Sequence, residues 1–373
     1  MIIAGEESGD MHGARLIKEL KNIDPTINIF GIGGDKMIDA GMDAQFNIKQ
    51  MAFLGFIEVI RHLPFINKVK RRLIKKIYEE SIDTIVLIDY PGFNLNLAKQ
   101  LHKSGKKIIY YISPQIWAWG LGRIRKIRKL ITKMIVVFQF EEKLYLDEGI
   151  DVEYVGHPLI EQIENYPFSS KKELFKKLGL DERKEILLIL PGSRKHEINK
   201  IFPECIKAAE RISNEYNMQT VVACSENINE SIFSKLSLQT NYTIAKGFTY
   251  DLMKYASFGI IKSGTSTLEA GYFQLPFIVV YSANVLTYWL GKKLVKINNI
   301  AMANIILGEN VVDELIQADL NSANIYLKSS VILKDKEIYN RIKIKLGKLK
   351  EILGGVGASR KSAILIYNLL NET

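Results

Sequence analysis

The sequence predicts an α/β protein made of two Rossmann-like domains whose parallel sheets face each other across a cleft. Short apolar segments alternate with helix-like segments along the whole chain, the pattern of repeated strand–helix–strand units. At 373 residues the chain is too long for one ordinary core. The polar stretch from Glu164 to Lys177, with Pro167 and a pair of serines, divides the alternation into two blocks and is the predicted linker. We therefore expect domains at 1–163 and 164–354.

The predicted strands are short, rich in β-branched residues and apolar without alternation. Such segments are typical of strands buried on both faces of a parallel sheet. The first block has them at Met1–Ala4, Ile27–Ile32, Thr84–Ile88, Lys107–Ile112, Met134–Val137 and Val152–Val155. The second block has them at Ile186–Leu190, Thr220–Ala223, Tyr242–Ala245, Gly259–Lys262 and Phe277–Tyr281. From about Asp335 the sequence is helical in character, interrupted by the glycines at 354–357.

Composition indicates a globular protein of the cytoplasm. Hydrophobic residues make up 47% and charged residues 25% of the chain, which excludes general disorder. Apolar runs such as Met134–Phe138 are far shorter than the about 20 residues of a membrane span. Strand-like sequence begins at Met1, which leaves no room for a signal peptide. Two cysteines are too few for a zinc cluster, and no histidine pair has metal-ligand spacing, so no metal or cofactor is expected.

Positive charge is concentrated in one part of the first block. Residues 61–133 contain 17 Lys and Arg against 4 Asp and Glu, a local charge of +13 in a chain of net charge +10. This pattern favours an anionic partner: a membrane surface, a nucleic acid or a phosphorylated ligand. Solvated helix faces would give the same composition.

Asp89 ends the buried strand Thr84–Ile88 and precedes the turn Tyr90-Pro91-Gly92. The carboxyl edge of a parallel sheet is where open α/β folds bind ligands. Asp89 is therefore either a catalytic acid or base, or a cap for the following helix.

Two turns in the second block suit a phosphate or diphosphate. The first contains Gly192, Ser193 and Arg194, where small residues let backbone N–H groups approach an anion and Arg194 adds a guanidinium group. The second contains Ser263, Gly264, Thr265 and Ser266 at the end of another strand. Glu269 follows and either accepts hydrogen bonds from a ribose or completes a capping box with Ser266.

The first block differs in its chemistry. Its glycine-rich turn, residues 5–10, contains three acids, which repel phosphate and suit neutral hydroxyl groups or the orientation of another group. The segment 51–69 is apolar and leads into a basic run, a pattern that suits an interface rich in anionic lipid or a core strand followed by a solvated helix. Its candidate membrane or acyl-chain contacts are Phe53, Phe56, Phe65 and Ile66, and a second aromatic segment contains Trp117 and Trp119.

With these motifs assembled, the chain resembles the lipid-A-disaccharide synthase family of GT-B glycosyltransferases. The resemblance runs nearly end to end. It rests on AGEESGD at 4–10, GIGGDKM at 31–37, MAFLGFIEV at 51–59, IDYPGFN at 88–94, SPQIWAW at 113–119, VGHP at 155–158, LPGSR at 190–194, SGTSTLE at 263–269 and MANIILG at 302–308.

The resemblance implies an inverting, metal-independent transfer of 2,3-diacylglucosamine from its UDP carrier to the 6-hydroxyl of 2,3-diacylglucosamine 1-phosphate (lipid X). The products would be the β-1,6 disaccharide 1-phosphate of lipid A biosynthesis and UDP. The resemblance makes Asp89 the candidate base, assigns Arg194 and Glu269 to UDP, places Asn304 in the donor site and matches Glu6 to a position important for activity. Where family members often have an acid after the proline of the Asp89 motif, this chain has Gly92.

Location and assembly are also implied by the resemblance. We expect a peripheral protein on the inner face of the inner membrane, with a helix at about 355–373 that packs back on the first domain. The family can form homodimers by exchanging C-terminal segments. Two rivals stay open: another GT-B protein acting on a UDP-sugar, such as an epimerase, and a basic nucleic-acid-binding protein. The second lacks any RNA- or DNA-binding signature in this sequence, so we expect no nucleic-acid partner.

Overall fold

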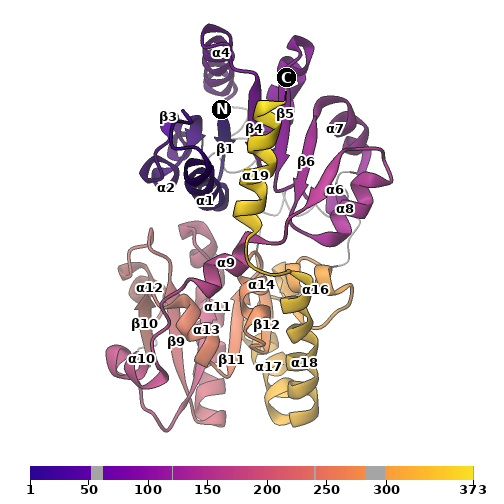
Figure 1. Ribbon diagram of the computed structural model, residues 1–373. Helices are drawn as coiled ribbons and strands as arrows, with labels where there is room; N and C mark the ends of the chain where they lie inside the picture. Colours follow the sequence, from indigo (N-terminus) through magenta and orange to yellow (C-terminus); the bar gives the residue numbers. More distant parts are fainter. Residues whose placement is uncertain (52–61, 120, 239–240, 283–298, 373) are drawn as a thin grey trace. The chain divides into compact units, whose positions relative to one another are not determined.

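The computed structural model describes residues 1–51, 62–119, 121–238, 241–282 and 299–372. The described residues form two compact units (Figure 1). Of the described residues, unit 1 contains those up to Glu164 and those from Leu353 onward, and unit 2 contains those between Asn165 and Ile352. Each unit has its own parallel sheet with helices around it, so the α/β prediction is confirmed.

The sheet of unit 1 has a topological switch point between β1 and β4. Its seven parallel strands have the order β3-β2-β1-β4-β5-β6-β7. The chain thus moves from β1 to one side, then returns to β4 and continues to the other side, and such switch points are where open α/β sheets bind ligands. The strands are β1 (Ile2–Ala4), β2 (Phe30–Gly33), β3 (Asp43–Asn47), β4 (Thr84–Ile88), β5 (Lys107–Tyr111), β6 (Lys133–Val136) and β7 (Val152–Tyr154).

The helices of unit 1 cover this sheet with apolar faces. In α4 the residues Val69, Leu73 and Ile77 recur at four-residue spacing and are fully buried in the core. The last helix, α19, packs on α1, and Glu161 caps it by accepting from the backbone N–H (2.8 Å) and hydroxyl (2.6 Å) of Ser359. The helices are α1 (Glu7–Ile23), α2 (Asp35–Asp39), α4 (Leu63–Glu79), α5 (Pro91–Leu101), α6 (Ile116–Trp119), α7 (Ile124–Leu130), α8 (Gln139–Leu146), α9 (Pro158–Glu164) and α19 (Ala358–Asn371).

Unit 2 repeats this plan with six parallel strands and a switch point between β8 and β11. The strand order is β10-β9-β8-β11-β12-β13. The strands are β8 (Glu185–Leu190), β9 (Met218–Cys224), β10 (Tyr242–Lys246), β11 (Phe258–Lys262), β12 (Phe277–Tyr281) and β13 (Glu314–Ile316). The helices are α10 (Lys171–Leu178), α11 (Lys195–Tyr216), α12 (Ser231–Leu236), α13 (Thr249–Tyr255), α14 (Ser266–Tyr272), α16 (Met302–Leu307), α17 (Ser322–Lys334) and α18 (Lys336–Ile352).

Two features differ from the sequence prediction. The edge strands β3 and β13 were not predicted, because neither has the continuous apolar run of a central strand. The predicted linker is also too long, since α10 lies within it. Ser170 and Glu173 form a capping box at the start of α10, and Leu174 and Phe175 are buried, so this polar stretch folds as an amphipathic helix.

Candidate functional site

The turn after β4 holds the predicted catalytic acid in a strained backbone. Asp89 and Tyr90 have φ angles of 42° and 48°, a left-handed conformation that costs about 1–2 kcal/mol for each non-glycine residue. Helix α5 begins at Pro91, so its cap residue is Tyr90 and not Asp89. The backbone carbonyl oxygen of Asp89 accepts hydrogen bonds from two buried side chains, which hold the turn in place. The donors are the Tyr110 hydroxyl at 2.6 Å and Asn94 Nδ2 at 2.7 Å. This geometry favours a chemical role for the carboxylate over a helix cap.

The turn after β1 lies beside the Asp89 turn at the switch point. Because β1 and β4 pair in parallel, with Ala4 opposite Ile88, their carboxyl ends meet at one edge of the sheet. Gly5 allows the ring of Tyr90 to pack against the β1 turn, since a Cβ at Gly5 would lie 2.1 Å from that ring. Glu6 comes next and is exposed. The structure therefore brings Glu6 and Asp89, the two predicted catalytic residues, to the same edge.

Burial and charge tune the Asp89 carboxyl group toward neutral pH. The pKa of Asp89 is raised from 3.8 to about 7: burial is the largest cause and the negative charge of Glu6 adds to it, while the backbone N–H of Tyr90 acts in the opposite direction. A general base is most effective when its pKa lies near the working pH. Asp89 has this property, whereas an exposed aspartate would be too weak a base.

We expect Glu6→Gln to shift the acidic limb of the pH–rate profile to lower pH. Removing the Glu6 charge lowers the pKa of Asp89, so the base stays ionised at a more acidic pH, while burial keeps most of the elevation. The profile of kcat/KM against pH measures this, and Glu7→Gln, an exposed neighbour on the same turn, is the matched control. An acidic limb that stays in place or moves upward would contradict the electrostatic coupling.

A third acid of the first glycine-rich turn is structural. The Asp10 carboxylate is buried and accepts hydrogen bonds from the backbone N–H groups of Gly34 (2.7 Å), Lys36 (3.2 Å) and Met37 (3.0 Å). Asp10 thus holds the start of α2 and the turn after β2. The sequence predicted that the acids of this turn either contact neutral hydroxyl groups or orient another group. Asp10 has the second role.

In unit 2 the first anion-suited turn joins β8 to α11. Gly192 has φ of 118°, a conformation that favours glycine, and a Cβ there would lie 2.6 Å from the Glu197 carboxylate. Ser193 and Arg194 are exposed, and Arg194 is the N-cap residue of the 22-residue helix α11. The guanidinium group and the first N–H groups of a long helix are thus presented together, as an anion site requires.

The second turn joins β11 to α14, and of the two alternatives for Glu269 the capping box is not formed. Helix α14 begins at Ser266 and, in the described structure, its cap Thr265 makes no side-chain capping bond. The Glu269 carboxylate instead accepts from the Tyr250 hydroxyl at 2.9 Å, and burial raises its pKa. Ser263 also has a structural partner, because its hydroxyl donates to the carbonyl of Ile300 at 2.9 Å. Gly264, Thr265 and Ser266 complete this turn.

An ion pair connects the two turns of unit 2. β8 and β11 are parallel neighbours, so both turns lie at one edge of the sheet. Lys262 Nζ lies 2.9 Å from Glu197 Oε1, and Glu197 is only 8% exposed in its side chain. Burial raises the pKa of Tyr281 on β12; the charge of Glu197 raises it further and that of Arg194 lowers it, so both charged groups lie near this hydroxyl. Neither Glu197 nor Tyr281 was predicted as a site residue from the sequence, although an acid three residues after Arg194, in the first turn of a helix, was a signal for Glu197.

Asn304 is fully buried in α16 and its amide is engaged within the protein. Its Nδ2 donates to Val312 O (2.8 Å), Glu314 Oε1 (2.9 Å) and Asn310 Oδ1 (3.0 Å), and its Oδ1 accepts from the backbone of Val311 and Val312. With both hydrogens and both lone pairs used, the amide holds the 310–312 segment. Asn304 can therefore contribute to a donor site only indirectly, by holding the 310–312 segment in place.

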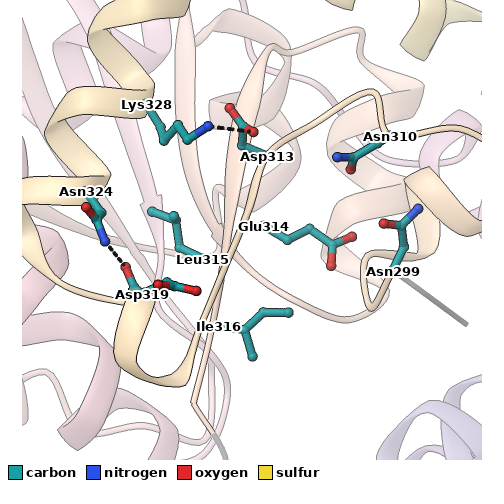
Figure 2. A pocket seen from close by; sticks show the side chains of 9 residues that line it. All are labelled: Asn299, Asn310, Asp313, Glu314, Leu315, Ile316, Asp319, Asn324 and Lys328. Atoms are coloured by element: carbon teal, nitrogen blue, oxygen red, sulfur yellow. Dashed lines mark hydrogen bonds and ion pairs between the residues drawn. The ribbon is translucent and has the colours of Figure 1, made fainter. Parts of the chain in front are cut away.

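A pocket of about 370 Å³ lies next to β13 in unit 2 (Figure 2). Figure 2 shows Asp313 paired with Lys328 at 3.2 Å and Glu314 directed toward Asn299 on the far side of the strand. Three carboxylates line this pocket and would repel a diphosphate. None of the residues lining it belongs to the turns after β8 and β11. The pocket therefore does not fit the predicted phosphate site.

The predicted membrane contacts fall into two groups. Phe53 and Phe56 lie outside the described residues. Phe65 and Ile66, in the first turn of α4, are half-buried and pack against the core of unit 1, with Phe65 edge-on to Phe46 at 6.4 Å between ring centres. The exposed apolar residue of this turn is Leu63, 44% exposed. Among the described helices, none combines the length and apolar character needed to cross a bilayer.

Comparisons with solved structures define the fold class. The chain aligns over its full length with a UDP-GlcNAc 2-epimerase from Neisseria meningitidis bound to UDP-GlcNAc (TM-score 0.65, 14% identity, 98% of that chain). It also aligns over its full length with S. aureus MnaA in a co-structure with UDP (TM-score 0.67, 16% identity, 96% of that chain). At these identities the likeness concerns the fold alone. The protein is thus a GT-B type α/β protein, as predicted.

The family follows from the sequence comparisons. A family model described as lipid-A-disaccharide synthetase matches residues 1–365. Lipid-A-disaccharide synthase of Geobacter sulfurreducens is 36% identical over 375 residues, covering 100% of this chain and 97% of the relative. The enzyme of Coxiella burnetii is 37% identical over 372 residues, covering 99% and 98%. The chain belongs to the lipid-A-disaccharide synthase family, which confirms the resemblance of its motifs.

Proposed function

We propose that this protein transfers 2,3-diacylglucosamine from UDP-2,3-diacylglucosamine to the 6-hydroxyl of lipid X in lipid A biosynthesis. Membership of the family over nearly the whole chain supports the reaction. The observation that carries the mechanism is the Asp89 turn, where a carboxyl group with a pKa of about 7 lies at the switch point of unit 1. The products are the β-1,6 disaccharide 1-phosphate and UDP.

In this proposal unit 1 supplies the base and unit 2 holds the leaving group. Asp89 takes the proton of the acceptor 6-hydroxyl as its oxygen attacks the anomeric carbon, and the bond from that carbon to the diphosphate breaks, leaving its electron pair on UDP. In-line attack inverts the anomeric centre. Arg194 and the N-terminus of α11 stabilise the charge on the departing diphosphate, and Glu269 accepts from the ribose hydroxyls.

A single assay tests the proposal against its nearest rival. The protein is incubated with UDP-2,3-diacylglucosamine and lipid X, and mass spectrometry detects the disaccharide 1-phosphate. A parallel incubation with UDP-GlcNAc alone measures epimerisation, the activity in the names of several solved structures with this fold. Disaccharide formation without epimerisation is the expected result, and the reverse outcome would replace the proposed reaction.

We propose further that unit 1 docks on an anionic membrane surface, because both substrates carry acyl chains. The exposed face of α4 supports this: Leu63 is followed by the exposed basic residues Lys68, Arg71, Arg72 and Lys75. Each basic residue near an anionic surface contributes about 1 kcal/mol to binding. An apolar residue beside such charges suits the lipid headgroup region.

The triple variant Leu63→Ser, Lys68→Gln, Arg71→Gln should therefore bind anionic vesicles at least roughly tenfold more weakly. Co-sedimentation with vesicles containing phosphatidylglycerol measures this, and Ile344→Ser, a 68% exposed apolar residue on α18, is the control. Phe65 is unsuitable for this test, because its replacement by serine would remove core packing. Equal sedimentation of variant and parent would refute docking through α4.

A homodimer formed by exchange of the C-terminal segment is also proposed from the family. In this chain α19 packs on its own α1, held by the Glu161 cap. Exchange would place the same α19 on the α1 of a second copy. Light scattering on the purified protein gives the mass in solution, and a strictly monomeric protein at high concentration would remove the proposal.

A further inference from the structure

One buried acid in unit 1 has no part in the mechanism so far. Glu141, in the first turn of α8, is 1% exposed. Its Oε1 accepts from the hydroxyl of Ser113 at 2.6 Å and from Nε1 of Trp117 at 3.0 Å. Its Oε2 is buried and, within the described part of the chain, has no hydrogen-bond partner. Burying a carboxyl group costs free energy, so apolar packing does not explain this residue.

The two donors to Glu141 belong to the segment that follows β5. This segment starts at Ile112, whose φ of 61° is a strained conformation for a β-branched residue. β5 pairs in parallel with β4, with Tyr111 opposite Ile88, so the segment begins beside the Asp89 turn. Strained residues persist only where surrounding contacts hold them, and they gather at functional sites. Glu141 ties this segment to α8 by two hydrogen bonds, beside an edge-on ring contact of Trp117 with Phe140 at 5.3 Å.

Two buried tyrosines, Tyr145 and Tyr110, lie near Glu141 and Asp89 respectively. Tyr145 lies one helical turn after Glu141, and its hydroxyl is buried without a hydrogen-bond partner among the described residues. Burial raises the pKa of both tyrosines; Asp89 and Tyr145 raise that of Tyr110 further, and Glu141 raises that of Tyr145, so these groups are electrostatic neighbours. Tyr110 in turn donates to the Asp89 carbonyl oxygen at 2.6 Å.

We propose that Glu141 is a positioning residue for Asp89. Its carboxyl group fixes the segment Ser113–Trp117, which leaves β5 beside the Asp89 turn. Together with Tyr110 at the end of β5, whose hydroxyl donates to the Asp89 carbonyl oxygen, this keeps the Asp89 turn in its left-handed conformation. The inference rests on the proposed role of Asp89 as the base. Glu141 itself does not touch the substrate.

A double-mutant cycle between Glu141→Leu and Tyr110→Phe tests this inference in the full-length enzyme. Each single variant should lower kcat by about 10- to 100-fold, the loss typical of groups that orient a functional residue. The Kd for UDP, measured by calorimetry, should not change, because the proposed UDP site is in unit 2. The double variant should lose much less than the product of the single losses. Glu141→Gln, which keeps an acceptor for Ser113 and Trp117, should restore most of the turnover.

Matched controls separate positioning from general damage. Tyr111→Phe makes the same chemical change at the next buried tyrosine, and Glu148→Leu makes the same change at an exposed acid beyond α8. The fold losses in kcat of Tyr111→Phe and Glu141→Leu should multiply in the double variant, as expected of independent sites. Glu148→Leu should leave kcat unaltered. If Glu141→Leu does not fold by circular dichroism, Ser113→Ala and Trp117→Phe, which each remove one bond to Oε1, replace it with the same expectations.

Normal kcat in folded Glu141→Leu or Ser113→Ala, or independent losses with Tyr110→Phe, would overturn the inference. Failure of the proposed base would appear separately, as near-normal turnover of Asp89→Asn.

Discussion

Asp89→Asn should abolish transfer and at the same time stabilise the protein. Loss of a general base typically lowers turnover by about 10²- to 10⁴-fold. The pKa of Asp89 is about 7 in the folded protein against 3.8 without the fold. Between these pH values the folded state binds a proton that the unfolded chain does not, so stability falls as pH rises and the full penalty is present above pH of about 7. Asparagine removes this penalty and tolerates the left-handed backbone at position 89.

Turnover and thermal melts measure the two effects together. At pH 8 the variant should be more stable than the parent by roughly 1–4 kcal/mol, and the difference should shrink toward pH 5. Asp83→Asn is the matched control, since Asp83 lies at the other end of β4, is exposed and pairs with Lys106 at 2.7 Å. Near-normal turnover would remove Asp89 from the mechanism. A destabilised variant would show that the carboxylate supports the turn after all.

Arg194→Ala should weaken UDP binding by roughly 1.5–3 kcal/mol, the contribution of a hydrogen bond to a charged group. Arg194 is exposed at the N-terminus of α11, so its loss removes a cation from the anion site without removing core packing. The expected change is about 10- to 100-fold in Kd by calorimetry.

Two comparisons make the Arg194 result specific. Arg183→Ala removes an equally exposed arginine of unit 2 that pairs with Asp181 at 2.9 Å, and UDP affinity should not change. Asp89→Asn should also bind UDP normally, because its proposed role concerns the acceptor. Unchanged affinity in Arg194→Ala would move the diphosphate away from the turn after β8.

Much of the framework could be predicted from local sequence. The run Thr84–Ile88 is apolar without alternation, and it is the fully covered central strand β4. Of the four edge strands in the described sheets, β7 and β10 were predicted, whereas β3 and β13 were missed because neither has the continuous apolar run of a central strand. The linker was predicted too long for a related reason, since the charged surface of α10 masks the two apolar residues that fix this helix.

The candidate site was only partly visible in the sequence. Glycines and hydroxyl residues after a strand indicate a turn suited to phosphate, because backbone N–H groups are reachable there. The capping-box alternative for Glu269 was equally consistent with local spacing. Only the fold decided it, by placing the Tyr250 hydroxyl 2.9 Å from the carboxylate.

By itself, the sequence determined the two parallel sheets, the acid after β4 and the order of motifs that identifies the family. The tertiary structure decided which strand ends are neighbours. It thereby placed Glu6 near Asp89, joined Lys262 to Glu197 and aligned the hydroxyl of Tyr110 with the Asp89 carbonyl oxygen. Apolar patterns depend on neighbours along the chain, whereas charge pairs, pKa shifts and strained turns depend on groups that come together only when the sheet forms. The conversion of Asp89 from a strand-end acid to a base with a pKa near 7 is of this second kind.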